Sequence, residues 1–363
     1  MGNNNSSINV TLDQAQPAIY IAGDVISGQV HFNITERTKK TDEIYLSLTG
    51  DIGYTTTRTV RMQNGQMERK TDCHNVRILG QKFLLGNPTV VKQTHHELFH
   101  HHNNDNHDAS TLEPGQYTYP FSIRLPDDLP PTLHPEDYPF VRYQLQVLLE
   151  KKWYHSNDRH RYPIRIFPRV NLYNISNSQS AVKFGTKRKD VTVKGVLQHA
   201  GLIPGEQTIL TLDIQNPNRV TIKRVDACFI QRYDIEQCRR RLELIRLPVA
   251  ELANNQDQHI EVTCPLVIPL GIPPSFSYRS NGIRSIVHVD LHYDLKLEIK
   301  AKGLFTDFDL QVPVIIGTTE NSNYNTRSTT VDTMNMVALD FTDDDMPPPP
   351  YDSIHNSDTS TRS

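Results

Sequence analysis

The 363-residue chain has few of the features that mark secreted proteins, membrane spans or nucleic-acid binders. It has four cysteines and no Cys-x-x-Cys pair, too few for a disulfide scaffold and the wrong spacing for a zinc ribbon. No apolar run approaches the length of a membrane-spanning helix, and no hydrophobic signal segment follows Met1. The formal charge of −3 gives no argument for nucleic acid. These absences predict a cytoplasmic protein of a reducing compartment.

Catalytic motifs are also scarce, because the chain has no glycine-rich phosphate loop and no Gly-x-Ser-x-Gly elbow. One pattern stands against this, His96-Glu97-Leu-Phe-His100. On a helix it would hold zinc between two imidazoles, with Glu97 as general base, and the chain would then be a zinc-dependent metallohydrolase. The segment 94–108 is crowded with histidine, asparagine and aspartate, however, so the motif arises easily by chance. We therefore predict a polar loop between two strands, with no catalytic residue and no cofactor; loose metal binding stays an alternative.

What the sequence does have is alternation of apolar and polar residues with a period of two, which predicts half-buried strands. The strand that begins at Ile44 is predicted to end at Gly50, and Asn64-Gly65 predicts a tight hairpin turn. The longest alternating run extends from Val287 to Ile299, and a second run after Gly303 predicts its antiparallel partner. This second run lies at 308–316, and the other predicted strands lie at 8–12, 30–34, 143–149, 162–166, 191–193, 210–214 and 260–266.

Many strands with few helix signals predict an all-β protein of two antiparallel, immunoglobulin-like β-sandwich domains. We place a flexible N-terminus at 1–7, the first sandwich at 8–170, a polar linker at 171–189, and the second sandwich at 190–318. The segment 319–363 is rich in Ser, Thr, Asn and Asp and poor in large apolar residues, which predicts a disordered tail. Within it, 336–341 is the one stretch with enough apolar residues to add as a strand to a sheet edge.

Near its end the tail carries four consecutive prolines followed by a tyrosine. The prolines predict an extended polyproline II segment, the shape that aromatic-lined grooves accept at little ordering cost. The order Pro-Pro-x-Tyr is that of ligands for WW domains, which seat two prolines between aromatic rings and the tyrosine in a neighbouring pocket. The plain alternative is a solubilising proline-rich end. We predict WW-domain binding by Pro348, Pro349, Pro350 and Tyr351.

Two further features bear on membranes. Gly2 with Ser6 fits the pattern for N-myristoylation, and an ordinary flexible N-terminus is the alternative. One acyl chain binds a membrane only marginally, so a second contact, to lipid or cargo, is required. The basic run 239–241 would suit acidic lipid heads, although such runs are more often solvated loops.

Several stretches along residues 8 to about 318 resemble sequence signatures of arrestin-fold proteins. Both their residues and their order along the chain carry the resemblance. These stretches are 20–30 (Tyr-Ile-Ala-Gly-Asp-Val-Ile-Ser-Gly-Gln-Val), 115–126, 129–132, 141–143, 201–206, 272–275 and 312–317. With the Pro-Pro-x-Tyr motif in the tail, the chain resembles the α-arrestins, the arrestin domain-containing proteins.

This resemblance implies a non-enzymatic adaptor. It would link membrane receptors or transporters as cargo to a HECT-type ubiquitin ligase through the ligase's WW domains, and so promote cargo ubiquitination, endocytosis and sorting. It implies a cytoplasmic location with recruitment to the plasma membrane and endosomes, and peripheral membrane contact. The chain departs from members that carry two such motifs, which leaves the ligase affinity open. A trafficking scaffold that recruits no ligase is a further alternative.

Overall fold

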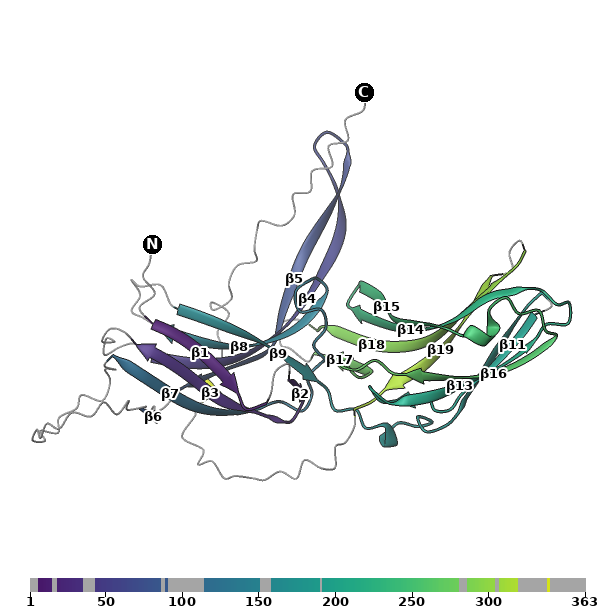
Figure 1. The fold of residues 1–363 in the computed structure, drawn as a ribbon. Coiled ribbons are helices and arrows are strands. Elements are labelled where there is room, and N and C mark those ends of the chain that lie inside the picture. Colours follow the sequence, from purple (N-terminus) through teal and green to yellow (C-terminus); the bar gives the residue numbers. More distant parts are fainter. Residues whose placement is uncertain are drawn as a thin grey trace, which may run out of the picture.

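Two β-sandwiches stand side by side, with a long two-stranded ribbon rising between them (Figure 1). The computed structural model describes residues 6–14, 18–34, 43–85, 89–90, 114–150, 158–189, 191–280, 286–303, 307–318 and 338–339. Every element in these ranges is a strand except two short 3-10 helices, η1 (Leu172–Asn174) and η2 (Ala250–Leu252). The all-β prediction of two sandwich domains is thereby confirmed.

The first sandwich consists of a four-stranded and a six-stranded sheet. The smaller sheet has the order β1 (Ser6–Leu12), β3 (Val25–Ile34), β7 (Gly115–Arg124) and β6 (Thr89–Val90). The larger has the order β2 (Ile19–Ile21), β9 (Asp158–Phe167), β8 (Phe140–Glu150), β4 (Glu43–Arg61), β5 (Met67–Leu84) and β20 (Ala338–Leu339). Within the larger sheet only β2 and β9 run parallel; the other neighbours are antiparallel.

The second sandwich repeats this division into a smaller and a larger sheet. Its four-stranded sheet has the order β10 (Val182–Arg188), β11 (Val191–Leu197), β13 (Gln207–Gln215) and β16 (His259–Val267). Its six-stranded sheet has the order β12 (Gly201–Leu202), β19 (Phe308–Ile316), β18 (His288–Ala301), β14 (Ile222–Ile235) and β15 (Cys238–Pro248), with β17 (Phe276–Arg279) also on β18.

Each sandwich forms because alternate side chains of its strands turn inward and leave water. Strand β3 alternates without exception, and Ile26 and Val30 are completely buried. Burying one side chain of this size stabilises the fold by roughly 1.5–3 kcal/mol. The long run predicted from Val287 behaves in the same way along β18, where Val289, Leu291 and Leu297 are fully buried. Its predicted hairpin with β19 is confirmed by the antiparallel register from Tyr293–Val314 to Ile299–Phe308.

The prediction that a strand ends at Gly50 is wrong, because β4 continues through it to Arg61. A side chain at Gly50 would place its Cβ 2.6 Å from the ring of Tyr143, and one at Gly53 would be 2.3 Å from the ring of Phe140. Both rings come from β8, the neighbouring strand. The glycines therefore mark close approaches of aromatic rings inside a strand, and not its end.

Part of the segment 171–189, predicted as a polar linker, is regular structure. It contains η1 and all of β10, which pairs with β11 from Val182–Leu197 to Arg188–Val191. The first five residues of β10 alternate between half-buried and exposed, but none of the strand's side chains is fully buried. An edge strand of this kind carries little periodic signal.

Within the tail that the sequence predicts to be disordered, 336–341 is the stretch able to add to a sheet edge, and its residues Ala338–Leu339 form a strand. This strand, β20, pairs antiparallel with β5, with Ala338 opposite Phe83 and Leu339 opposite Lys82. It lies at the outer edge of the larger sheet of the first sandwich. An uncovered edge strand attracts other chains, so β20 protects this part of β5.

Candidate functional site at the junction of the two sandwiches

The residues to which the sequence assigned chemistry all lie outside the described part of the chain. This holds for Gly2, for His96, Glu97 and His100, and for the WW-binding residues Pro348, Pro349, Pro350 and Tyr351. The site that the structure does define is the junction where the sandwiches, the base of the ribbon and the start of the tail meet.

The first contact across this junction is made by a cysteine. Strand β8 stops pairing with β4 at Gly53, which leaves the edge of β4 open beyond that residue. The Cys238 thiol, at the start of β15, takes the vacant position: it donates to the Thr55 carbonyl at 3.0 Å and accepts from the Thr55 amide at 3.3 Å. A hairpin of the second sandwich thus continues the hydrogen bonding of a sheet in the first.

The second contact joins the same hairpin to the loop that follows β7. The ring of Tyr233 stacks on His134 with centroids 5.6 Å apart, and Arg240 donates to the Tyr138 carbonyl at 2.8 Å. Burial raises the pKa of the Tyr233 hydroxyl to about 12. The Tyr233 hydroxyl therefore stays protonated near neutral pH.

The third contact fixes the point where the tail leaves the body. Thr318 follows β19, and its amide donates to the Val170 carbonyl at 2.9 Å. In return the Val170 amide donates to the Thr318 hydroxyl oxygen at 3.0 Å. Because Val170 ends the first sandwich, the last residue before the tail is bonded to the opposite domain.

Beside the junction the second sandwich carries a basic basin of about 440 Å³, lined by Arg232, Arg239, Arg240, Arg241, Asp234 and His292. The run 239–241, which the sequence left open between a solvated loop and a lipid contact, lies on strand β15. Two arginines of the basin are paired with carboxylates: Arg239 lies 3.5 Å from Asp234, and Arg232 lies 2.6 Å from the buried carboxylate of Asp294.

A second charged cluster covers the outer face of the same sheet. Arg246 bonds Asp226 at 3.0 Å and Glu298 at 2.8 Å, and Lys296 also bonds Glu298. Hydrogen bonds from Arg246 and then Lys296 lower the pKa of the Glu298 carboxyl to about 2. Every charge in the cluster has a partner, so we assign it a structural role.

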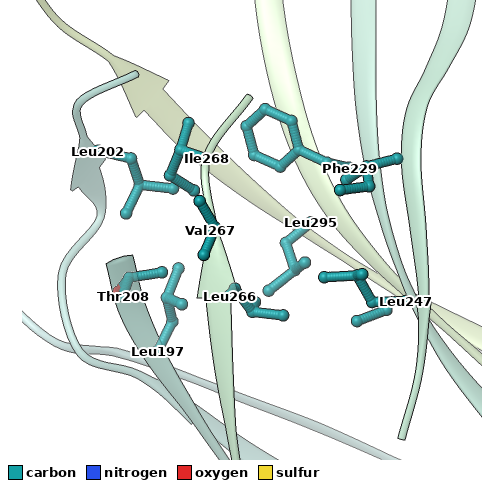
Figure 2. Close-up of a pocket in the computed structure, with 11 residues that line it drawn as sticks. Leu197, Leu202, Thr208, Phe229, Leu247, Leu266, Val267, Ile268 and Leu295 are labelled. Carbon is teal, nitrogen blue, oxygen red and sulfur yellow. The ribbon is translucent and has the colours of Figure 1, made fainter. Parts of the chain in front are cut away.

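The cavity between the sheets of the second sandwich is too small for an organic ligand. The gap between the two sheets of the second sandwich measures about 10 Å³ and is lined by apolar side chains apart from Thr208 (Figure 2). Leu197 and Leu266 come from the smaller sheet, while Phe229, Leu247 and Leu295 come from the larger one. A cavity of this volume is at the lower limit for a single water molecule.

The described ranges contain neither a cluster of metal ligands nor a membrane-spanning helix. In them no three His, Cys, Asp or Glu residues come together as a metal site would require. No helix among the residues with an assigned structure has the length and apolar character to cross a membrane.

The fold and the junction define a class: tandem antiparallel sandwiches, joined edge to edge, with the tail anchored between them. Residues 8–173 match the model of the arrestin (or S-antigen) N-terminal domain, and residues 187–321 match that of the C-terminal domain. The chain belongs to the arrestin-domain family. A search of curated proteins found no match. Both matched families are arrestin domains, which are generally non-enzymatic scaffolds and suggest an adaptor in trafficking.

Sequence reasoning noted Arg240 only as part of the basic run 239–241 and gave no sign of the junction itself. Thr55 and Cys238 are 183 positions apart, and neither lies in a motif. Thr55 lies just beyond the end of the β4–β8 pairing, and Cys238 lies at the start of β15. Neither position can be recognised from a pattern in the sequence.

Proposed function

We propose that this protein is an adaptor of the α-arrestin type that brings a WW-domain HECT ubiquitin ligase to membrane-protein cargo. The observation that carries the proposal is the combination of two arrestin domains with a Pro-Pro-x-Tyr tail beyond them, at 348–351. Ubiquitination by the recruited ligase then promotes endocytosis and sorting of receptors or transporters. The protein acts from the cytoplasm, at the plasma membrane and endosomes, without a cofactor.

The chemistry of the motif assigns a role to each of its residues. Pro348 and Pro349 enter the groove between aromatic rings of the WW domain, and Tyr351 enters the neighbouring pocket. Pro350 holds the backbone extended between them, because its ring fixes φ. Acylation of Gly2 would add one membrane contact, which is marginal by itself.

The anchoring of the tail supports this proposal by limiting how far the ligase can move. From Thr318, bonded to Val170, to Pro348 the chain has 30 residues, but from Leu339 in β20 it has only 9. The effective concentration of a tethered group falls roughly as the −3/2 power of the linker length. Pairing of β20 with β5 therefore raises the concentration of the motif near the first sandwich about sixfold.

The test is binding of the full chain to a panel of WW domains from HECT ligases. We expect micromolar binding that Tyr351→Ala weakens at least about tenfold, since the variant removes the side chain that fills the second pocket. Tyr324→Ala is the matched control, because Tyr324 lies in the same tail outside the motif. Equal binding by Tyr351→Ala and Tyr324→Ala would exclude the motif as the ligand.

A second measurement separates the adaptor from a scaffold that recruits no ligase. Ubiquitin conjugates on cargo should decrease in cells that express Tyr351→Ala in place of the natural chain. Conjugates that persist unchanged, with WW binding lost, would favour the scaffold.

A further inference from the structure

The tip of the β4–β5 ribbon combines exposed methionines with basic residues. Neither the tail motif nor the junction of the two sandwiches explains this combination. The strands of the ribbon pair from Thr55–Cys73 to Arg61–Met67, and the turn closes with the Met62 amide donating to the Gln66 carbonyl at 2.7 Å. Asn64-Gly65 forms this turn as the sequence predicted, and Gly65 has φ +84°. Along residues 62–71 every side chain is exposed.

Within the described ranges, the recorded contacts of the ribbon with the rest of the molecule lie at its base. Thr55 is bonded to Cys238, and the ring of Tyr54 stacks on His74 with centroids 4.8 Å apart. Farther out, Arg58 pairs with Asp72 at 2.8 Å. A two-stranded ribbon by itself is marginal in water, so a base that aims it away from both sandwiches points to a role at the tip.

Two methionines occupy the tip, one at each end of the turn. Met62 is 45% exposed and Met67 is 68% exposed, and no other element covers either of them within the described ranges. Methionine is flexible and apolar, and adapts to irregular or fluid surroundings.

Basic residues surround these methionines. Arg61 lies directly opposite Met67, and Arg69 and Lys70 follow within three residues, which is about 10 Å along a strand. That distance is about one Debye length at physiological ionic strength. Glu68 is the only acidic residue between positions 57 and 71.

We propose that the tip of the β4–β5 ribbon is a membrane-contact site that inserts Met62 and Met67 into the interface of an anionic bilayer. The basic residues behind them face the negative lipid heads, and each strengthens binding about fivefold. The convex shape favours a bilayer over a folded protein partner. A narrow tip buries far less area on a solid surface than the roughly 800 Å² that a stable interface needs, whereas lipid closes around it.

The test is co-sedimentation of the full, unacylated chain with vesicles of phosphatidylcholine, with and without phosphatidylserine. We expect the chain to bind the anionic vesicles and to lose most of this binding in high salt. Met62→Gln with Met67→Gln should weaken it about tenfold, because two apolar side chains no longer enter the interface. Leu270→Gln is the matched control, since Leu270 is 81% exposed in a turn of the second sandwich.

Charge variants test the second half of the proposal. Arg61→Gln with Arg69→Gln should weaken binding about 25-fold, from two losses of about fivefold. Lys183→Gln with Lys194→Gln removes the same charge from exposed positions of β10 and β11 and should change little. Glu68→Gln should strengthen binding about fivefold, a gain that misfolding cannot produce.

A tryptophan at the tip reports insertion directly. Met67→Trp should shift its emission to the blue on anionic vesicles, against the constant background of the chain's single natural tryptophan, Trp153. The proposal is overturned if the natural chain ignores anionic vesicles, or if the tip variants bind them as well as the natural chain does. Loss of cargo binding with vesicle binding intact would assign the tip to a protein partner instead.

Discussion

Two long antiparallel strand pairs, β4–β5 in the first sandwich and β14–β18 in the second, differ in what covers them. β14 and β18 stay inside their sheet along their full pairing, from Ile222–Ala301 to Ile235–Val289. β4 pairs with β8 only as far as Gly53, and beyond the Thr55–Cys238 bonds β4 and β5 pair only with each other within the described ranges. The longer pair is therefore the less buried one.

Charges differ between the pairs in the same way. On the outer face of β14–β18 the carboxylates of Asp226 and Glu298 are bonded to Arg246. On the outer half of the ribbon Arg58–Asp72 is the ion pair that the structure records, and the tip has an excess of basic residues. Paired charges stabilise a sheet locally, whereas an uncompensated group of one sign is suited to a partner of opposite charge.

The largest expected difference between the pairs is in their core energetics. Leu297 on β18 is fully buried between Ala227 and Leu310 on the neighbouring strands. Leu297→Ala should lower the free energy of unfolding by about 3 kcal/mol, from lost burial and the cavity left behind. Val60→Ala on the ribbon should cost less than about 0.5 kcal/mol. Urea unfolding followed by circular dichroism measures both, and equal losses would mean that the ribbon is packed against something.

The next effect depends on pH. The pKa of Glu298 is about 2 in the folded protein, below the ordinary value of 4.5, so its pairing stabilises the fold at neutral pH. This contribution is fully present above pH 4.5 and is lost as the pH falls toward 2. Glu298→Gln should therefore lower stability by about 2 kcal/mol at pH 7, and by progressively less below pH 4.5.

The ribbon supplies the control for that experiment. Glu68→Gln should change stability by less than about 0.5 kcal/mol throughout the same pH range, because its exposed side chain lies on the tip. A pH-independent loss for Glu298→Gln would show that the residue acts through packing and not through its charge.

The smallest effect concerns the edge of β5, below the ribbon, where the tail strand pairs. Leu339→Pro removes an amide and the extended pairing of β20, so hydrogen exchange around Lys82 and Phe83 should accelerate about fivefold, the equivalent of one hydrogen bond. Thr333→Pro, in the tail outside β20, should leave exchange there unchanged. Global stability should stay within about 0.5 kcal/mol in both variants. Identical exchange in the two variants would argue against pairing of the tail in solution.

Much of the fold was predictable because half-buried strands leave a period of two. The alternating run from Val287 to Ile299 predicted β18, and Asn64-Gly65 predicted the turn at the tip of the ribbon. The prediction from sequence failed at glycine, because a glycine can either end a strand or make room for a neighbouring side chain inside one. Gly50 resembles a strand end, but it receives the ring of Tyr143 from β8, and that neighbour is 93 positions away.

The sequence by itself determined the all-β class, the inward face of each long strand, and the proline motif in the tail, because these depend on local order and side-chain type. Tertiary structure alone decided that Cys238 completes the edge of β4, that Thr318 is bonded to Val170, and that the ribbon stands clear of both sandwiches. The physical reason is that these contacts join groups far apart in the chain. Their energies exist only after both sandwiches have folded and met, so no local pattern carries them.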